Sequence, residues 1–119
     1  MSGSVHWVTE GDIKEGKLDD FKELMAEMVE RVRADEPDML NYEWFLSEDG
    51  RRCQVYERYK SSAVAMAYLA TYRRSYAERF LAAVTPTRMM VYGDPDDAVR
   101  GALSHSDPVY FSTIGGFIR

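Results

Sequence analysis

Apolar residues recur along this chain with two different periods, and these periods predict the order of its secondary-structure elements. Short stretches rich in aromatic and β-branched residues predict strands at 5–10, 39–47, 52–59, 87–92 and 109–114. Longer stretches in which apolar residues recur every three to four positions predict helices at 18–32, 62–84 and 96–103. The predicted order is β-α-β-β-α-β with a C-terminal extension.

Local signals mark where these elements begin and end. Pro37 ends the first helix because it lacks a backbone N–H and disfavours the α conformation of the residue before it. Gly50 completes a hairpin turn, in which a positive φ is needed. Ser61 or Ser62 is expected to cap the second helix, and Pro86 marks the exit from it.

This order predicts an α+β fold of the ferredoxin-like type, in which both long helices cover one face of an antiparallel sheet. The second strand is apolar on both of its faces, so the face without helices also needs a cover. The large residues expected on that open face are Tyr42, Trp44, Tyr56 and Tyr59. An apolar patch of this size predicts a homodimer, with a second copy as the cover.

Composition limits the class of protein. With 119 residues, 45% apolar, the chain is expected to be a single domain, 1–119, with a core at 5–92 and an extension at 93–119. A net charge of −5 argues against nucleic acid as a partner. No apolar stretch is long enough to predict a membrane span, and the start of the chain does not resemble a signal peptide, so we expect a cytoplasmic protein.

The sequence also lacks the usual cofactor motifs. Cys53 is the only cysteine, which excludes an intrachain disulfide and a thiolate metal cluster, and it is expected to be an inert strand residue. There is no phosphate loop, dinucleotide fingerprint, zinc-protease motif or serine nucleophile motif. We therefore expect no metal, haem or flavin.

Three groups of residues are candidates for chemistry. Glu43 and Glu57 lie within aromatic strands, where a carboxylate must be paired or have a raised pKa. An ion pair to an arginine (Arg52, Arg58 or Arg88) is favoured over a catalytic base. On the second helix Tyr68, Tyr72, Tyr76 and Phe80 recur every fourth residue, as either core or a pocket wall. The histidines, His6 and His105, are far apart in sequence.

Several of these segments together resemble a known family. They are Phe21, the run Glu36-Pro37-Asp-Met-Leu-Asn41-Tyr42, and the run Val55-Tyr56-Glu57-Arg58-Tyr59-Lys-Ser61, which precedes a helix of small residues. Across 5–92 the chain is similar to the antibiotic biosynthesis monooxygenase domain. That resemblance implies a ferredoxin-like unit that pairs sheet to sheet as a dimeric α+β barrel.

The sequence departs from the family pattern at two positions. Asp38 stands where glycine is common, and since Asp tolerates the left-handed conformation at modest cost, the turn is expected to survive. Tyr68 stands where many members have histidine. The residues by which haem-degrading members are recognised are absent, which argues against haem degradation.

The resemblance implies a cofactor-independent monooxygenase that oxidises a small phenol, quinol or polycyclic aromatic with molecular oxygen. The expected catalytic residues are Asn41, Tyr72, His6 and Glu57, and the expected substrate-binding residues are Trp7, Trp44, Tyr68 and Tyr76. One alternative is a non-catalytic dimeric barrel that binds a small apolar metabolite. Another is an isomerase or lyase, which would need a histidine or a carboxylate at the centre of the cavity.

Overall fold

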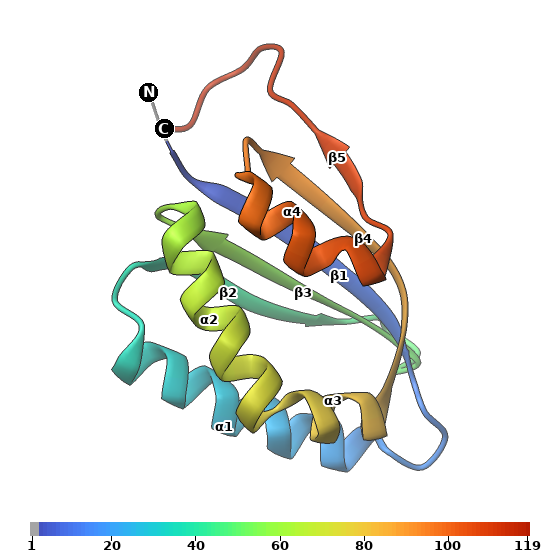
Figure 1. The fold of residues 1–119 in the computed structure, drawn as a ribbon. Helices are drawn as coiled ribbons and strands as arrows, with labels where there is room; N and C mark the ends of the chain where they lie inside the picture. Colours follow the sequence, from blue (N-terminus) through green and yellow to red (C-terminus); the bar gives the residue numbers. More distant parts are fainter. Residues whose placement is uncertain (1–2) are drawn as a thin grey trace.

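The computed structural model describes residues 3–119 as one five-stranded sheet with helices against one face (Figure 1). The strands are β1 (Val5–Ile13), β2 (Met39–Leu46), β3 (Arg52–Tyr59), β4 (Val84–Gly93) and β5 (Val109–Phe111). The helices are α1 (Leu18–Asp35), α2 (Ser62–Ser75), α3 (Ala77–Ala83) and α4 (Asp97–Leu103), and a 3-10 turn, η1 (Ser104–Ser106), follows α4. The predicted α+β class is confirmed.

The strand order is β2-β3-β1-β4-β5. β1 pairs antiparallel with both β3 and β4, and β2 pairs antiparallel with β3, as the ferredoxin-like topology requires. The extension adds β5 parallel to β4 at the edge of the sheet, and places α4 on the same face as α1, α2 and α3 (Figure 1). β5 ends at Phe111, three residues earlier than predicted.

The turn and capping signals act locally as expected. Gly50 has a φ of 73° in the turn between β2 and β3. The Ser61 side chain accepts a hydrogen bond of 3.3 Å from the Val64 backbone N–H and so caps α2. Asp96 caps α4 in the same way, with 2.9 Å to the Val99 N–H. Short polar side chains therefore fix where these two helices begin.

The turn before β2 differs from the expectation. Asp38 does not have a positive φ; in the described part of the chain Asp107, beyond η1, is the one residue other than glycine that does. A hydrogen bond of 3.0 Å from the Met39 N–H to the Glu36 carbonyl closes the turn instead. A turn of this span has forms in which no residue needs a left-handed conformation, so Asp38 replaces glycine without strain.

The helix predicted over 62–84 is in fact two helices. It breaks at Tyr76, whose φ of −131° and ψ of −24° lie outside the α-helical range, and α3 starts at the next residue. The buried Tyr76 ring belongs to the core cluster that also contains Phe21 and Leu24 of α1. The tyrosines that recur every fourth residue are therefore divided: Tyr68 and Tyr72 stay on α2, whereas Tyr76 joins the packing beneath α1.

The strands alternate between the two sheet faces, and this alternation corrects the expected open face. Tyr42, Trp44 and Tyr59 lie on the helix side, where they pack into the core clusters. Tyr56 lies on the open side, where its hydroxyl is 3.0 Å from His6 Nδ1. The helix face therefore holds more of the large aromatic residues than the sequence pattern suggested.

The open face carries a mixed surface rather than a purely apolar one. His6 stacks on Tyr92, and Tyr92 stacks in turn on Phe111 of β5. Glu10 is hydrogen-bonded to Gln54 and Arg88 on the same face. In residues 3–119 no element of this chain covers that face (Figure 1).

Candidate functional site

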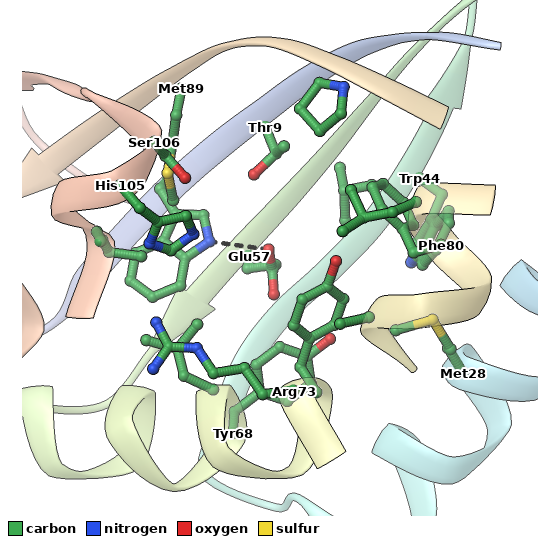
Figure 2. Close-up of a pocket in the computed structure, with 18 of the residues that line it drawn as sticks. Thr9, Met28, Trp44, Glu57, Tyr68, Arg73, Phe80, Met89, His105 and Ser106 are labelled. Atoms are coloured by element: carbon green, nitrogen blue, oxygen red, sulfur yellow. Dashed lines mark hydrogen bonds between the residues drawn. The ribbon is translucent and has the colours of Figure 1, made fainter. Parts of the chain in front are cut away.

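A cavity of about 510 Å³ lies between the sheet, helices α2 and α3, and the α4–η1 segment (Figure 2). That volume falls within the usual range for small-molecule sites. The sheet contributes Trp7, Thr9, Trp44, Glu57 and Met89, and α2 and α3 contribute Tyr68, Tyr72 and Phe80. The cavity wall therefore combines aromatic and aliphatic side chains with several polar groups.

Glu57 lies near the centre of this cavity, where β3 turns its side chain toward the helices (Figure 2). The residue is 7% exposed. Its carboxylate accepts hydrogen bonds from Trp7 Nε1 at 2.8 Å and from the Tyr59 hydroxyl at 2.6 Å. Trp7 is the partner of Glu57 in the β1–β3 register, so strand pairing itself brings the indole N–H to the carboxylate.

Burial raises the pKa of Glu57 to about 7, and the hydrogen bonds from Tyr59 and Trp7 offset only part of that rise. No cation within ion-pair distance was found for Glu57 among the described residues, so the favoured prediction of an ion pair to Arg52, Arg58 or Arg88 is wrong for this carboxylate. Because its pKa is close to neutrality, Glu57 can both take up and release a proton there. Glu43, by contrast, is exposed outside the cavity.

The cavity tyrosines remain protonated. Tyr68 and Tyr42 share a hydrogen bond of 3.0 Å between their hydroxyls, and burial followed by the nearby Glu57 charge raises the pKa of both. The same two causes raise the pKa of Tyr72 to about 12. In the described structure the Tyr72 hydroxyl has no hydrogen-bond partner, so it is a free donor at the cavity wall.

Trp44 provides a second free donor. Its indole nitrogen is buried and has no hydrogen-bond partner within residues 3–119. Burial raises the pKa of Tyr42 and the neighbouring Trp44 nitrogen offsets part of that rise, but the two groups do not have hydrogen-bond geometry. A buried N–H without a partner costs about 1–3 kcal/mol. An oxygen atom of a bound molecule would remove that cost.

The C-terminal extension completes the cavity with residues that the sequence analysis did not assign to the site. Leu103, His105 and Ser106 line its edge, and Arg73 of α2 lines the same cavity. The Arg73 guanidinium donates a hydrogen bond to the Ala102 carbonyl, which ties α2 to α4. No sequence signal identified this wall, because residues about thirty positions apart meet there only through the sheet topology.

Three of the predicted site residues lie away from the cavity. His6 and Asn41 are on the open face of the sheet, and Tyr76 is in the core beneath α1. Burial, together with the Arg58 charge, lowers the pKa of His6, so the imidazole is neutral near pH 7. The other five predicted residues, which are Trp7, Trp44, Glu57, Tyr68 and Tyr72, line one cavity.

Neither a metal site nor a reactive thiol is evident at this cavity. The described residues contain no group of three or more His, Cys, Asp or Glu side chains that could hold a metal ion. Cys53 is buried, and burial raises its pKa to about 11. The arrangement of the cavity suits acid–base chemistry on a small, largely apolar molecule.

In the described chain no helix is both long and apolar enough to cross a membrane.

The sequence model of a family described as antibiotic biosynthesis monooxygenase matches residues 4–86. MupZ from Pseudomonas fluorescens has a similar fold, with a TM-score of 0.87 and 24% identity over 100% of this chain and 91% of that one. Protein SO0527 from Shewanella oneidensis has a TM-score of 0.66 at 20% identity, covering 77% and 91%. SnoaB, a cofactor-independent oxygenase from Streptomyces nogalater, has a TM-score of 0.66 at 13% identity, covering 80% and 96%. No curated protein matches the chain.

Proposed function

Because the chain belongs to the antibiotic biosynthesis monooxygenase family, we propose that it is a cofactor-independent monooxygenase for a small phenol, quinol or polycyclic aromatic. The observation that carries the proposal is Glu57, a carboxyl group with a pKa of about 7 at the centre of an aromatic cavity. Such a group is matched to removing a weakly acidic proton near neutral pH.

The proposed reaction begins when the Glu57 carboxylate removes a proton from the substrate. The resulting phenolate or carbanion passes one electron to molecular oxygen, and the radical pair recombines to form a carbon–oxygen bond. Protonated Glu57 returns its proton to the peroxide. Loss of water then leaves a carbonyl, so that a methylene group and one oxygen molecule become one carbonyl group and one water molecule. The substrate supplies all the electrons, so the scheme needs no cofactor.

The cavity also offers donors for the charge that develops on the substrate oxygen. The indole N–H of Trp44 and the hydroxyl of Tyr72 are both without partners in the described structure. Donors that are already in place stabilise a developing oxyanion without reorganising. The proposal therefore assigns Trp44 and Tyr72 to binding the substrate oxygen, and Glu57 to proton transfer.

The same proposal includes a homodimer formed through the open face. Half-buried His6, Val8, Tyr56 and Tyr92 lie on that face without a cover from this chain. Asn41 also lies there, so any catalytic role for His6 or Asn41 would have to involve the dimer interface rather than the cavity. Light scattering that gives twice the chain mass of 13.7 kDa at micromolar concentration supports pairing, and a persistent monomer contradicts it.

A second candidate function is isomerase or lyase chemistry that uses the same base without oxygen. It is favoured by the observation that the cavity centre holds a carboxyl group, the feature this alternative requires. Proton removal next to a carbonyl and return at another atom would use Glu57 in both steps. The two candidates differ in one measurable respect, the consumption of oxygen.

The test is oxygen uptake with a panel of quinols and anthrones, followed by the same panel under nitrogen. We expect uptake above the uncatalysed rate, lowered at least about hundredfold in Glu57→Gln. The control is Glu43→Gln, which removes a carboxylate outside the cavity. Turnover that persists under nitrogen would favour the isomerase or lyase. A protein that binds panel compounds but converts none in either atmosphere would support the non-catalytic alternative.

A further inference from the structure

The edge of the cavity between α2 and η1 carries polar nitrogen groups. Figure 2 shows the Arg73 guanidinium and the His105 ring on the same side of the cavity, away from Trp44 and Phe80. Arg73 is held in place by its hydrogen bond to the Ala102 carbonyl. A guanidinium has five N–H groups, so most of its donors remain available after that bond.

The charges around the cavity contrast with those of the whole chain. The net charge is −5, yet Glu57 is the single acidic residue among the described cavity residues. The other lining arginine, Arg88, is paired with Glu10, 2.9 Å away. Arg73 has no carboxylate within ion-pair distance in the described part of the chain. An unpaired guanidinium beside an apolar cavity is therefore placed to meet an acidic group of a ligand.

We propose that the substrate is an amphipathic molecule with a carboxylate at one end, and that Arg73 and His105 bind this carboxylate at the cavity edge. The apolar body then lies along Tyr68, Tyr72 and Met89, with the reacting group at Glu57. This inference rests on the proposed function only for the identity of the reacting group. Binding of the carboxylate by Arg73 and His105 does not depend on which reaction occurs at Glu57.

A carboxylate fits the arrangement better than a phosphate. The guanidinium presents pairs of parallel N–H groups that match the two oxygens of a carboxylate, and the imidazole adds one further N–H donor. Only one arginine is available, which balances a single negative charge rather than a dianion. The cavity volume of about 510 Å³ leaves room for an apolar body beyond the acid.

The position of this site in the chain makes it a determinant of specificity. His105 belongs to the C-terminal extension, whereas the family match ends at residue 86. Glu57 and the aromatic residues that line the cavity lie within the matched segment. The proposal therefore places the chemistry in the family core and divides the binding of the acidic group between Arg73 of that core and His105 of the extension.

The structure supplies a direct readout for a binding experiment. The chain has two tryptophans, and both Trp7 and Trp44 line the cavity, so tryptophan fluorescence reports on its occupancy. The probes are phenylbutanoate and phenylbutanamide, which differ in charge and are similar in size. At low salt and about pH 8, where the acid is ionised, we expect the acid to bind about tenfold more tightly than the amide.

Two variants test the assignment. In Arg73→Met, which keeps an aliphatic stem, we expect the preference for the acid to vanish while the affinity for the amide stays unchanged. In His105→Gln, at an exposed turn position, we expect the preference to fall a few-fold. The matched control is Arg74→Met, which removes the same charge from the neighbouring exposed position outside the cavity and should keep the preference.

Three outcomes would overturn the proposal: equal binding of the two probes by the wild-type protein, no binding of the acid at millimolar concentration, or an equal loss of both probes in Arg73→Met. The last result would mean that Arg73 only ties α2 to α4. The experiment needs no turnover. A clear preference for the acid in a protein that consumes no oxygen would therefore support this site while contradicting the monooxygenase proposal.

Discussion

Two largely buried glutamates lie on opposite faces of the same sheet, and their pKa values are shifted in opposite directions. Glu57, on the helix face of β3, is surrounded by rings, and burial raises its pKa to about 7. Glu10, on the open face of β1, is hydrogen-bonded to Arg88 at 2.9 Å and to Gln54 at 2.7 Å, and these bonds lower its pKa. Both residues are only 7–8% exposed, so low exposure by itself does not decide whether the pKa of a carboxyl group rises or falls.

The difference lies in the partners and in the depth of burial, because burial is the largest influence on the pKa of Glu57, whereas at Glu10 the hydrogen bonds from Arg88 and Gln54 outweigh it. Glu57 accepts two hydrogen bonds from neutral donors, which compensate only part of the cost of taking a charge out of water. Glu10 is also paired with the positively charged Arg88, whose side chain is well exposed. A carboxylate that is buried among neutral groups is suited to proton transfer, whereas one that is paired with a cation is suited to holding strands together.

The largest expected effect is on the pH dependence of turnover. If the Glu57 carboxylate is the base, kcat/KM for a substrate from the quinol panel should rise about tenfold per pH unit below pH 7 and level off above it, which amounts to about a hundredfold between pH 5 and the plateau. The measurement is a rate profile at constant ionic strength. A profile that is already flat from pH 5 upward would contradict a base with a raised pKa.

The second prediction concerns stability. Glu57 has a higher pKa in the folded state than in the unfolded chain, so the folded state holds the proton more tightly and loses stability as the pH rises from about 4.5 to about 7. Relative to Glu57→Gln, the wild type should lose about 2 kcal/mol of unfolding free energy between pH 5 and pH 7.5. Urea unfolding of both proteins at several pH values measures this, and parallel curves would contradict the raised pKa.

Glu10 should show the opposite sign. Its pKa is lowered in the folded state, so its contribution is present above the unfolded-state pKa and is lost as the pH falls. Relative to Glu10→Gln, the wild type should gain stability as the pH rises from acid to neutral, by roughly 1 kcal/mol since Arg88 is solvent-exposed. Turnover should not change. The same urea series with this variant checks the sign, and a loss of stability in this direction would remove the contrast.

The smallest expected effect is that of the free hydroxyl of Tyr72. Tyr72→Phe removes one oxygen from a half-buried residue, so unfolding free energy should stay within about 0.5 kcal/mol of wild type. If the hydroxyl donates to the developing oxyanion, kcat should fall a few-fold to about tenfold with little change in KM. Tyr76→Phe is the control, because Tyr76 lies in the core outside the cavity. Equal turnover in wild type and Tyr72→Phe would contradict this role.

Much of the fold could be predicted because its signals are local. Gly50 and the capping serine Ser61 act on backbone groups within three residues, so their effects are written in short segments of sequence. The break at Tyr76 was not predicted, because the residues around it favour helix and the ring is instead drawn into packing against α1. Local propensity was overridden there by a tertiary contact.

The candidate site was predicted only in part for a related reason. The period of two within a strand separates its residues into two sets but does not say which set faces the helices. The predicted site therefore combined Asn41 and His6 of the open face with Trp7 and Glu57 of the helix face. Arg73 and His105 were not assigned to that site, because they come together only after the extension has packed beside α2.

The sequence by itself determined the order of the elements, the ferredoxin-like class, the family and the presence of carboxylates among aromatic residues. Each of these depends on spacing along the chain or on the chemistry of single residues. Only the tertiary structure decided that Glu57 points into a cavity, that it has no cation beside it, and that its pKa rises to about 7. Ionisation depends on everything within a few ångströms in space, and for Glu57 most of those neighbours come from other strands and helices.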